Sequence, residues 1–167
     1  MTTPSLPPVP WRHETFMRLA LDEAERAAAL GEIPVGAVLV CDGEVVARAH
    51  NTREIHHDPL GHAELTALRE GARRLGRWRL TGCTLYVTLE PCPMCAPALV
   101  QARVDRIVFG AMDPKLGAAG TVFNLVDRRE FNHRPEVIAG ICEEEAQTVL
   151  KRFFGRRRAG EIHGWPE

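Results

Sequence analysis

Two cysteines and one histidine have the types and spacing of metal ligands. Cys92 and Cys95 are three positions apart, which places both thiols on one side of a first helical turn, and His62 precedes them in the chain. Thiolate and imidazole are ligands that Zn²⁺ prefers. We predict one zinc ion per subunit, held by His62, Cys92 and Cys95. Structural zinc sites normally close with four ligands, so three ligands indicate a catalytic site with one position open to water.

Glu64 stands two positions after His62 and is not needed as a ligand. Zinc lowers the pKa of a bound water from about 15.7 to about 7, which supplies a nucleophile at neutral pH. A carboxylate beside such a water can carry protons, so we predict that Glu64 is the catalytic acid and base. The pattern H-x-E followed by P-C-x-x-C is a known signature of zinc-dependent deaminases of nucleobases.

The C-x-x-C pair has two plainer interpretations. A redox pair is one, but it requires a thioredoxin-like βαβ context and leaves His62 and Glu64 unexplained. A structural zinc site is the other, and it needs a fourth ligand. Cys83 is the nearest candidate, although it precedes the strand-like segment 84–90 and so lies away from Cys92. The catalytic metal site explains more of these residues than either alternative.

Length and composition indicate one soluble domain. The chain has 167 residues, of which 45% are hydrophobic and 26% charged, as in ordinary globular proteins. No apolar run has the length of a membrane span, and the proline-rich start lacks the features of a signal peptide. We therefore predict a cytoplasmic protein with no membrane association. The formal net charge is −1, so binding of RNA would require a local basic patch.

Apolar periodicity and turn residues divide the chain into helices and strands. Helices are predicted over 13–30, 62–75, 92–103 and 143–158, with a short helix over 121–126. Strands are predicted over 34–41, 44–50, 84–90, 104–110 and 137–141, with a hairpin turn at Asp42-Gly43. The expected fold class is α/β, a three-layer α/β/α domain with a mixed five-stranded sheet. The expected deaminase domain spans 13–159, between a disordered leader over 1–12 and a flexible tail over 160–167.

The expected elements explain how the ligands could meet. His62 and Glu64 begin one helix, and positions i and i+2 serve a single metal only at the N-terminal edge of a helix. Cys92 and Cys95 begin another helix. Two helix N-termini would then meet at the zinc, at the carboxyl ends of the strands, where open α/β folds bind their ligands.

From Thr15 to Arg158 the chain resembles the bacterial tRNA adenosine deaminases, within the cytidine deaminase superfamily that the zinc motifs indicate. The segments that carry the resemblance, besides the zinc motifs, are 33–38, 57–59, 84–92, 110–115, 117–120, 132–134 and 153–158. It implies a cytidine deaminase-like fold and hydrolytic conversion of adenosine to inosine at the wobble position of a tRNA anticodon loop. It also implies a homodimer, for which the apolar residues Ala96, Leu99 and Val100 are candidates.

The resemblance also suggests substrate contacts. Asn51 sits where the family has a base-contacting asparagine, Asp113 could accept from a sugar hydroxyl, and Lys115 could meet a phosphate. The remaining suggested contacts are a segment at Asn132, His133 and Arg134, a stacking face at Phe154, and a basic patch that begins at Arg156. Each has a plainer interpretation. Asn51 could simply end a hairpin, Asp113 and Lys115 could form a surface turn, Phe154 could be core, and the arginines could be a solvated helix end.

Three functions are compatible with these residues. The first is deamination of adenosine in tRNA. The second is deamination of a free base or nucleotide, such as guanine or a cytosine nucleotide, by the same zinc chemistry. The third is a non-catalytic, zinc-stabilised RNA-binding module. Glu64 argues against the third, because a binding module needs no proton carrier. The basic C-terminal helix argues against the second, because a free nucleotide has no evident use for it.

Overall fold

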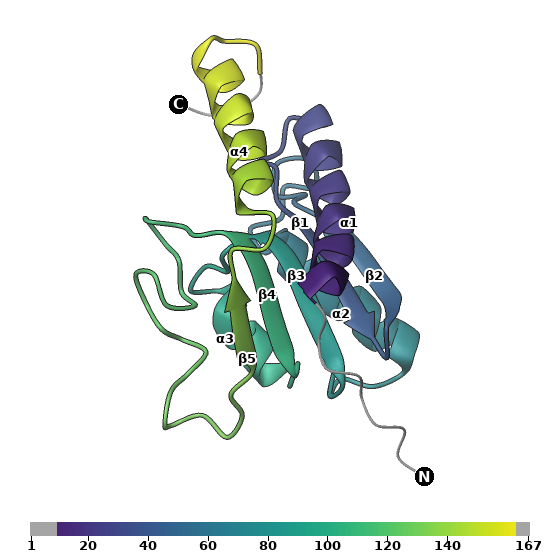
Figure 1. Ribbon diagram of the computed structural model, residues 1–167. Coiled ribbons are helices and arrows are strands. Elements are labelled where there is room, and N and C mark those ends of the chain that lie inside the picture. Colours follow the sequence, from purple (N-terminus) through teal and green to yellow (C-terminus); the bar gives the residue numbers. More distant parts are fainter. Residues whose placement is uncertain (1–9, 163–167) are drawn as a thin grey trace.

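The computed structural model describes residues 10–162, with side chains from Arg12 onward. Five strands form one sheet in the order β2-β1-β3-β4-β5 (Figure 1). Their bounds are β1 Gly36–Cys41, β2 Glu44–His50, β3 Cys83–Leu89, β4 Arg106–Ala111 and β5 Glu136–Ala139. β1 pairs antiparallel with β2 and β3, whereas β3, β4 and β5 are parallel. The prediction of a mixed five-stranded sheet is confirmed.

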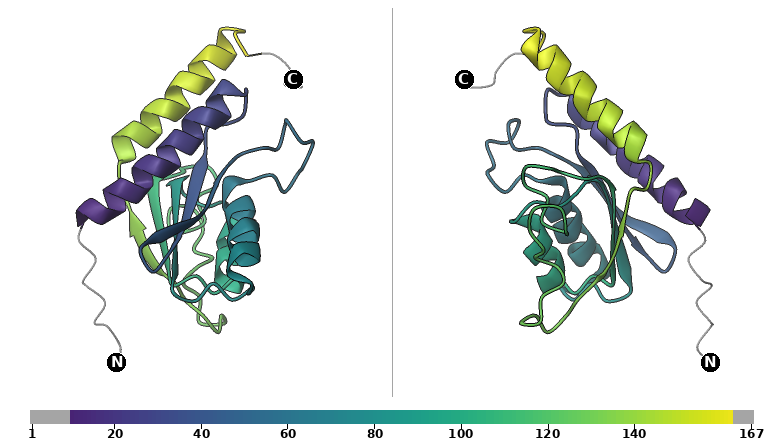
Figure 2. Two further views of the ribbon diagram at one scale, coloured as in Figure 1. Left: turned by 90° about the vertical axis from the view of Figure 1, so that its right-hand side faces the viewer. Right: turned by 60° about the vertical axis from the view of Figure 1, so that its left-hand side comes forward.

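Four helices cover the sheet in two layers. α1 (Pro10–Ala29) and α4 (Glu143–Arg158) lie side by side over one face, and α2 (Ala63–Leu75) and α3 (Cys95–Gln101) cover the other (Figures 1 and 2). α3 connects β3 to β4, and this crossover makes the two strands parallel, as the sequence predicts. The three-layer α/β/α prediction is therefore confirmed.

Alternation along β1 divides the core between the two helical layers. Val38 and Val40 pack with Met17 and Ala20 on the α1 side. Leu39, on the opposite face, joins the larger cluster under α2 and α3. Burial of such a side chain stabilises the fold by roughly 1.5–3 kcal/mol relative to leaving it exposed. Both faces of this strand are therefore committed to the core, which explains its continuous apolar sequence.

A glycine allows α1 to approach the sheet closely. A Cβ placed on Gly36 would lie 1.9 Å from the carbonyl oxygen of Ala20, which is backbone and cannot turn aside. Because only glycine fits here, the start of β1 fixes the height of α1 over the sheet.

The turn between β1 and β2 is a two-residue hairpin at Asp42 and Gly43. Both residues have positive φ, 51° and 79°, which is the backbone of a type I′ turn. Cys41 pairs with Cys83, the first residue of β3, so the turn lies at the amino end of β3. The predicted hairpin is confirmed.

The structure differs from the prediction over 121–126, where no helix forms. Ala119 and Asn124 instead make an isolated antiparallel bridge. The amides of Ala119 and Thr121 donate to a side-chain carboxylate, that of Glu90, and Gly120 has a φ of 130°. The amides of Leu125 and Val126, which would bond within such a helix, instead donate to the carbonyl of Ala118 at 2.9 Å and to Asn124 Oδ1 at 3.4 Å.

The predicted chain ends and the predicted dimer face can be compared with the structure. α1 begins at Pro10, three residues before the helix predicted from 13. The greater part of the predicted leader (1–9) and of the predicted tail (163–167) lies outside the described residues. Ala96, Leu99 and Val100, candidates for a dimer face, are buried in the core. Within residues 10–162 no helix combines the length and apolar character that a membrane span requires.

Candidate active site

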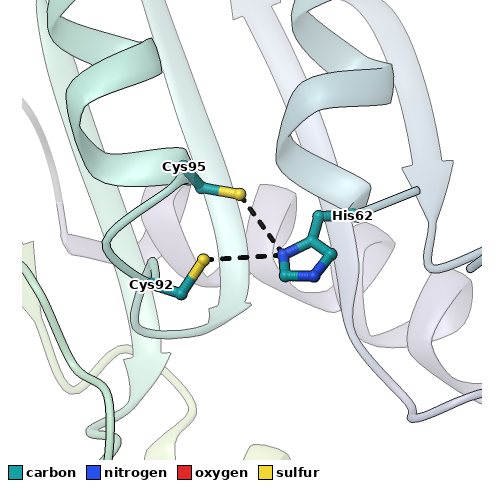
Figure 3. Close-up of side chains that lie close together, drawn as sticks. All are labelled: His62, Cys92 and Cys95. Carbon is teal, nitrogen blue, oxygen red and sulfur yellow. Dashed lines mark hydrogen bonds between the residues drawn. The ribbon is translucent and has the colours of Figure 1, made fainter. Parts of the chain in front are cut away.

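The three expected ligands converge at the carboxyl end of β3 (Figure 3). His62 is the residue before α2, and Cys95 is the first residue of α3. The amide of Ala96 donates to the carbonyl of Cys92 at 2.9 Å, which puts Cys92 on the same turn as Cys95. Cys92 Sγ lies 3.6 Å and Cys95 Sγ 3.4 Å from His62 Nδ1. Among the described residues, these three offer ligand atoms that all lie within 4.8 Å of one another.

These distances fit a tetrahedral zinc ion. With bonds of about 2.3 Å to sulfur and about 2.0–2.1 Å to nitrogen, tetrahedral geometry separates the two donors by roughly 3.6 Å. His62 presents Nδ1 to both thiols, so Nδ1 is the nitrogen suited to the metal. Cys83 begins β3 at the opposite end of the strand, where its partner is Cys41. Cys83 is therefore unsuited to be the fourth ligand of a structural site.

Hydrogen bonds among the three side chains shift their pKa values in different directions. The bond with Cys95 lowers the pKa of the Cys92 thiol to about 3, although burial opposes this shift. The same bond, together with burial, raises the pKa of Cys95. The bond with Cys92 raises the pKa of His62. Zinc binds thiolate and neutral imidazole, so its uptake must displace protons, and metal affinity should fall as the pH falls.

Glu64 lies in the first turn of α2 with only 4% of its surface exposed. Burial is the largest cause of its raised pKa, whereas the hydrogen bond with Cys95 and the charge of His62 oppose that shift. A raised pKa makes a carboxyl group a better proton acceptor, as a group that carries protons must be. Glu64 thus lies where a proton carrier for the metal site is required.

A cleft of about 190 Å³ opens beside the ligands. One wall comes from the segment before β1 and the loop over 51–61, and the other from the end of β3 and the loop over 113–121. The lining residues are Glu32, Ile33, Val35, Asn51, Arg53, His62, Glu64, Leu89, Glu90, Cys92, Asp113 and Leu116. Apolar side chains from Ile33, Val35, Leu89 and Leu116 alternate in this lining with polar groups that can orient a ligand, as in a small-molecule or base pocket.

Asn51 lines the cleft, and its amide also supports the metal site. Its Oδ1 accepts from the amide of Ala63 at 3.0 Å, and its Nδ2 donates to the carbonyl of Ile33 at 3.1 Å. An amide has two donors and two lone pairs, so one of each remains for a base edge. Asn51 therefore holds the start of α2 beside His62 whether or not it also contacts substrate.

The two predicted contacts in the loop after β4 point to different depressions. Asp113 lines the metal cleft, and its Oδ1 accepts from the amides of Lys115 at 2.9 Å and Leu116 at 3.2 Å, which makes the loop turn. Lys115 instead lines a second depression of about 550 Å³ between this loop and α4. This second depression, which we call the basic groove, is lined by Ala111, Met112, Pro114, Lys115, Gln147, Leu150, Lys151, Phe154 and Arg158.

The structure separates the remaining predicted contacts. Phe154 faces the basic groove, whereas Arg156 pairs with Glu161 at 3.1 Å and faces a depression on the α1 side. Asn132, His133 and Arg134 lie at the amino ends of β4 and β5, because His133 Nε2 donates to the carbonyl of Val104 at 2.6 Å. This is the end of the sheet opposite the cleft. As substrate contacts, Arg156 and these three residues stay predictions.

Sequence reasoning missed two buried carboxylates in the cleft wall. Glu32 is 1% exposed and accepts from the amide of Ile55 at 2.6 Å, which ties down the loop over 51–61. Glu90 is 2% exposed and accepts from the opposite loop. The available signal was a charged residue directly beside a buried strand. Glu32 directly precedes the family-like segment 33–38, and Glu90 lies within the family-like segment 84–92. The resemblance by itself gives neither glutamate a role of its own.

The fold and donor set define a zinc-dependent deaminase. Residues 10–111 match the family model for the cytidine and deoxycytidylate deaminase zinc-binding region, which confirms the predicted class and cofactor. More specifically, the chain belongs to the family of tRNA-specific adenosine deaminases. It is 52% identical to the Bacillus subtilis member over 145 residues, covering 87% of this chain and 90% of that one. It is 49% identical to the Haemophilus influenzae member, covering 87% of this chain and 84% of that one.

Solved structures agree with this assignment. A structure from a study of A-to-I editing by tRNA:A34 deaminases at the wobble position is 44% identical, with a TM-score of 0.79, and covers 81% of this chain and 99% of that one. A guanine deaminase from Nitrosomonas europaea covers 93% of this chain and 97% of its own, with a TM-score of 0.72 but only 22% identity. The second likeness shows the shared fold alone.

The geometry predicts which cysteine substitutions remove zinc. Cys92→Ala should lose the metal, because it deletes one of three ligands, whereas Cys83→Ala should retain about one zinc per chain. Metal analysis of the two purified variants measures this directly. Equal loss of zinc from both variants would indicate a four-ligand structural site and overturn the three-ligand assignment.

Proposed function

We propose that this protein catalyses the hydrolytic deamination of adenosine to inosine at the wobble position of a tRNA anticodon. The observation that carries the proposal is a three-ligand metal site beside the buried carboxylate of Glu64, in a chain 52% identical to a tRNA-specific adenosine deaminase. A three-ligand site leaves a position for water, and Glu64 supplies the proton transfers. Conversion of adenosine to inosine in tRNA, with release of ammonia, is the activity to assay.

In this mechanism His62, Cys92 and Cys95 would hold the zinc ion, which would lower the pKa of the attacking water. Glu64 takes a proton from that water and gives it to the ring nitrogen beside C6, the carbon that carries the amine, as the C6–O bond forms. Glu64 then moves the proton of the new C6 hydroxyl to the amine, and the C6–N bond breaks so that the amine leaves as ammonia. One carboxylate buried beside the ligands can serve each transfer in turn.

The size and lining of the cleft suit a base that has left its stack. An anticodon base must be turned out before its C6 can reach the metal site. The free donor and acceptor of Asn51 can read the edge of the base, and Asp113, on the facing wall, can accept from a sugar hydroxyl. These contacts require an unpaired loop, which an anticodon provides.

The two alternative functions are less favoured. Deamination of free guanine would draw on the likeness to the Nitrosomonas europaea enzyme, which at 22% identity extends to the fold alone. A non-catalytic RNA-binding module would not need a carboxylate buried against the metal ligands, since burial of Glu64 costs free energy unless the charge is used or compensated. Incubation of the protein with tRNA and with free bases in parallel, with assays for inosine and ammonia, distinguishes the proposed function from deamination of a free base.

Glu64→Gln should retain zinc, fold and tRNA affinity but lose nearly all turnover. The amide keeps the shape of the side chain and removes the oxygen that takes the proton. Transfer by a positioned side chain is worth roughly 10²–10⁴-fold in rate. Inosine formation, zinc content and tRNA binding should be measured on one preparation. Glu70→Gln, on an exposed part of α2, is the matched control. Near wild-type turnover in Glu64→Gln would contradict a role of Glu64 in proton transfer.

The basic groove is proposed to bind the tRNA backbone next to the reacting base. Lys115, Lys151 and Arg158 supply positive charge around the face of Phe154, and the loop that carries Lys115 also carries Asp113 into the cleft. Cations that contact phosphates release counterions, whereas an aromatic face can stack a base. The groove therefore joins the two kinds of contact that single-stranded RNA requires.

Replacing Lys115, Lys151 and Arg158 by Ala should weaken tRNA binding and flatten its salt dependence. Each lost phosphate contact lowers the slope of log K against log salt by about 0.7–0.9. Activity on a very short RNA hairpin should suffer less, because it makes fewer backbone contacts. Arg156→Ala tests the other face of the same helix. If only Arg156→Ala changes the slope, the RNA follows that face and not the groove.

We also propose a homodimer that works in the cytoplasm, where cell fractionation should find the activity.

An apolar groove lies between α2 and α3 on the layer that carries the ligands, and Trp78 beside it is 61% exposed. It is lined by Leu65, Leu68, Arg69, Ala72, Trp78, Leu80, Ala98, Gln101 and Ala102. A large exposed aromatic beside an apolar groove is typical of an interface.

Sedimentation velocity checks the dimer. The wild-type chain should sediment as a dimer, and Trp78→Glu should shift it toward monomer, because a charge would be buried at the interface. Leu30→Glu, at an equally exposed apolar residue following α1, should leave the dimer intact. A monomeric wild-type chain, or equal effects of both substitutions, would contradict the proposed interface.

A further inference from the structure

Glu90 is a buried carboxylate of the cleft to which the proposed reaction gives no part. It follows the last residue of β3, is 2% exposed, and lies two positions before the ligand Cys92. Burial of a carboxylate is costly unless hydrogen bonds satisfy its oxygens. The partners that satisfy it therefore indicate what the residue does.

Those partners, within the described chain, come from the loop over 113–121. Oε1 accepts from the amide of Asp113 at 3.3 Å and from the hydroxyl of Thr121. Oε2 accepts from the amides of Ala119 at 3.0 Å and Thr121 at 3.2 Å. One side chain thus joins both ends of the loop. Hydrogen bonds to an ionised acceptor are about twice as strong as neutral ones.

The middle of the loop wraps closely around the same carboxylate. A Cβ on Gly117 would lie 2.6 Å from Glu90 Oε1 and 2.5 Å from the carbonyl oxygen of Asp113. Two backbone bonds add to the attachment. The amide of Glu90 donates to Ala111 at 2.8 Å, and that of Ala118 donates to Pro91 at 2.9 Å. The loop is therefore built on the short stretch of chain that leads from β3 into the metal site.

This attachment determines one wall of the cleft. The loop contributes Asp113 and Leu116 to that wall, and it makes no helix of its own. Hydrogen bonds inside the loop form a turn at Asp113, which accepts from the amides of Lys115, Leu116 and Gly117. This turn shapes the loop but does not attach it to the sheet, so the position of the wall depends on the contacts with Glu90.

We propose that Glu90 is a positioning residue that holds the loop over 113–121 at a fixed distance from the metal ligands and thereby sets substrate affinity. Glu90 acts through Asp113 and Leu116 and does not touch the reacting atoms. The proposal rests on the function proposed above only for the identity of the substrate. The anchoring itself is a property of the folded chain and can be measured without catalysis.

Glu90→Gln is the most direct test. The amide has the volume of the carboxyl group, but its NH₂ cannot accept a hydrogen bond. Each oxygen of Glu90 accepts from at least one backbone N–H, so either orientation of the amide sets its NH₂ against at least one backbone donor. The KM for tRNA should rise about tenfold or more, while kcat changes by less than about threefold and zinc stays near one per chain. Glu130→Gln, at an exposed carboxylate paired with Arg128, is the matched control and should change neither constant.

Two further measurements separate positioning from a general loss of stability. Hydrogen exchange of the Ala119 and Thr121 amides should become faster in Glu90→Gln, while amides of β3 stay protected. Thr121→Val removes one donor and should raise KM by a smaller factor, and Thr121→Ser should restore the wild-type value. If Glu90→Gln does not fold, the Thr121 pair still decides the proposal.

Other outcomes overturn the proposal. Unchanged exchange in the loop, or a KM that does not move in Glu90→Gln and Thr121→Val, would show that Glu90 does not position the wall. A lower kcat at constant KM, with a lower unfolding temperature, would show a role in stability alone. If the wild-type protein fails to form inosine in tRNA, the proposed function fails, but the exchange experiment still tests the anchoring.

Discussion

The structure depends on one geometric constraint, that donor atoms from two distant segments must lie within 4.8 Å of one another. His62 directly precedes α2 and the two cysteines follow β3, so the start of α2 and the end of β3 must lie at the same edge of the sheet. The antiparallel pairing of β1 with β3 and the packing of α2 under β1 bring them there. The α3 crossover then returns the chain to β4, parallel to β3. The pairing of the strands thus fixes the distance between His62 and the two cysteines.

Three buried glutamates around this point have different tasks. Glu32 and Glu90 each accept hydrogen bonds from backbone amides of a loop. The two loops lie on either side of the cleft, so each of these side chains holds one cleft loop in place. The principal interactions of Glu64 are instead with Cys95 and His62. Burial raises the pKa of a carboxyl group, and nearby donors or cations lower it. The same residue type is therefore in different chemical environments at these three positions, according to the partners the fold provides.

The sequence predicts the metal site of His62, Cys92 and Cys95 and the order of elements well, because short spacings and apolar periodicity carry that information. It predicts the loop after β4 poorly. The helix expected over 121–126 does not form: Thr121 is held by the distant Glu90, and the amides of Leu125 and Val126 donate to Ala118 and to the side chain of Asn124. The location of Asn132 to Arg134, at the amino ends of β4 and β5, depends on the tertiary pairing of these strands, which the local sequence does not specify. Phe154 and Arg156 are two positions apart on α4, a rotation of about 200° around the helix axis, so they face opposite sides of it.

The tight turn at Asp42 and Gly43 has a practical consequence for attaching probes. It lies at the amino end of β3, and the metal ligands follow the carboxyl end of that strand. A seven-residue strand separates the two points by roughly 20 Å. Apart from the two neighbouring residues, no heavy atom of the described chain lies within 4 Å of a Cβ built on Gly43, so this position of the turn faces open space. Exposed loop tips of this kind tolerate insertions. A fluorophore or affinity tag placed there would report on the molecule from the end remote from its chemistry.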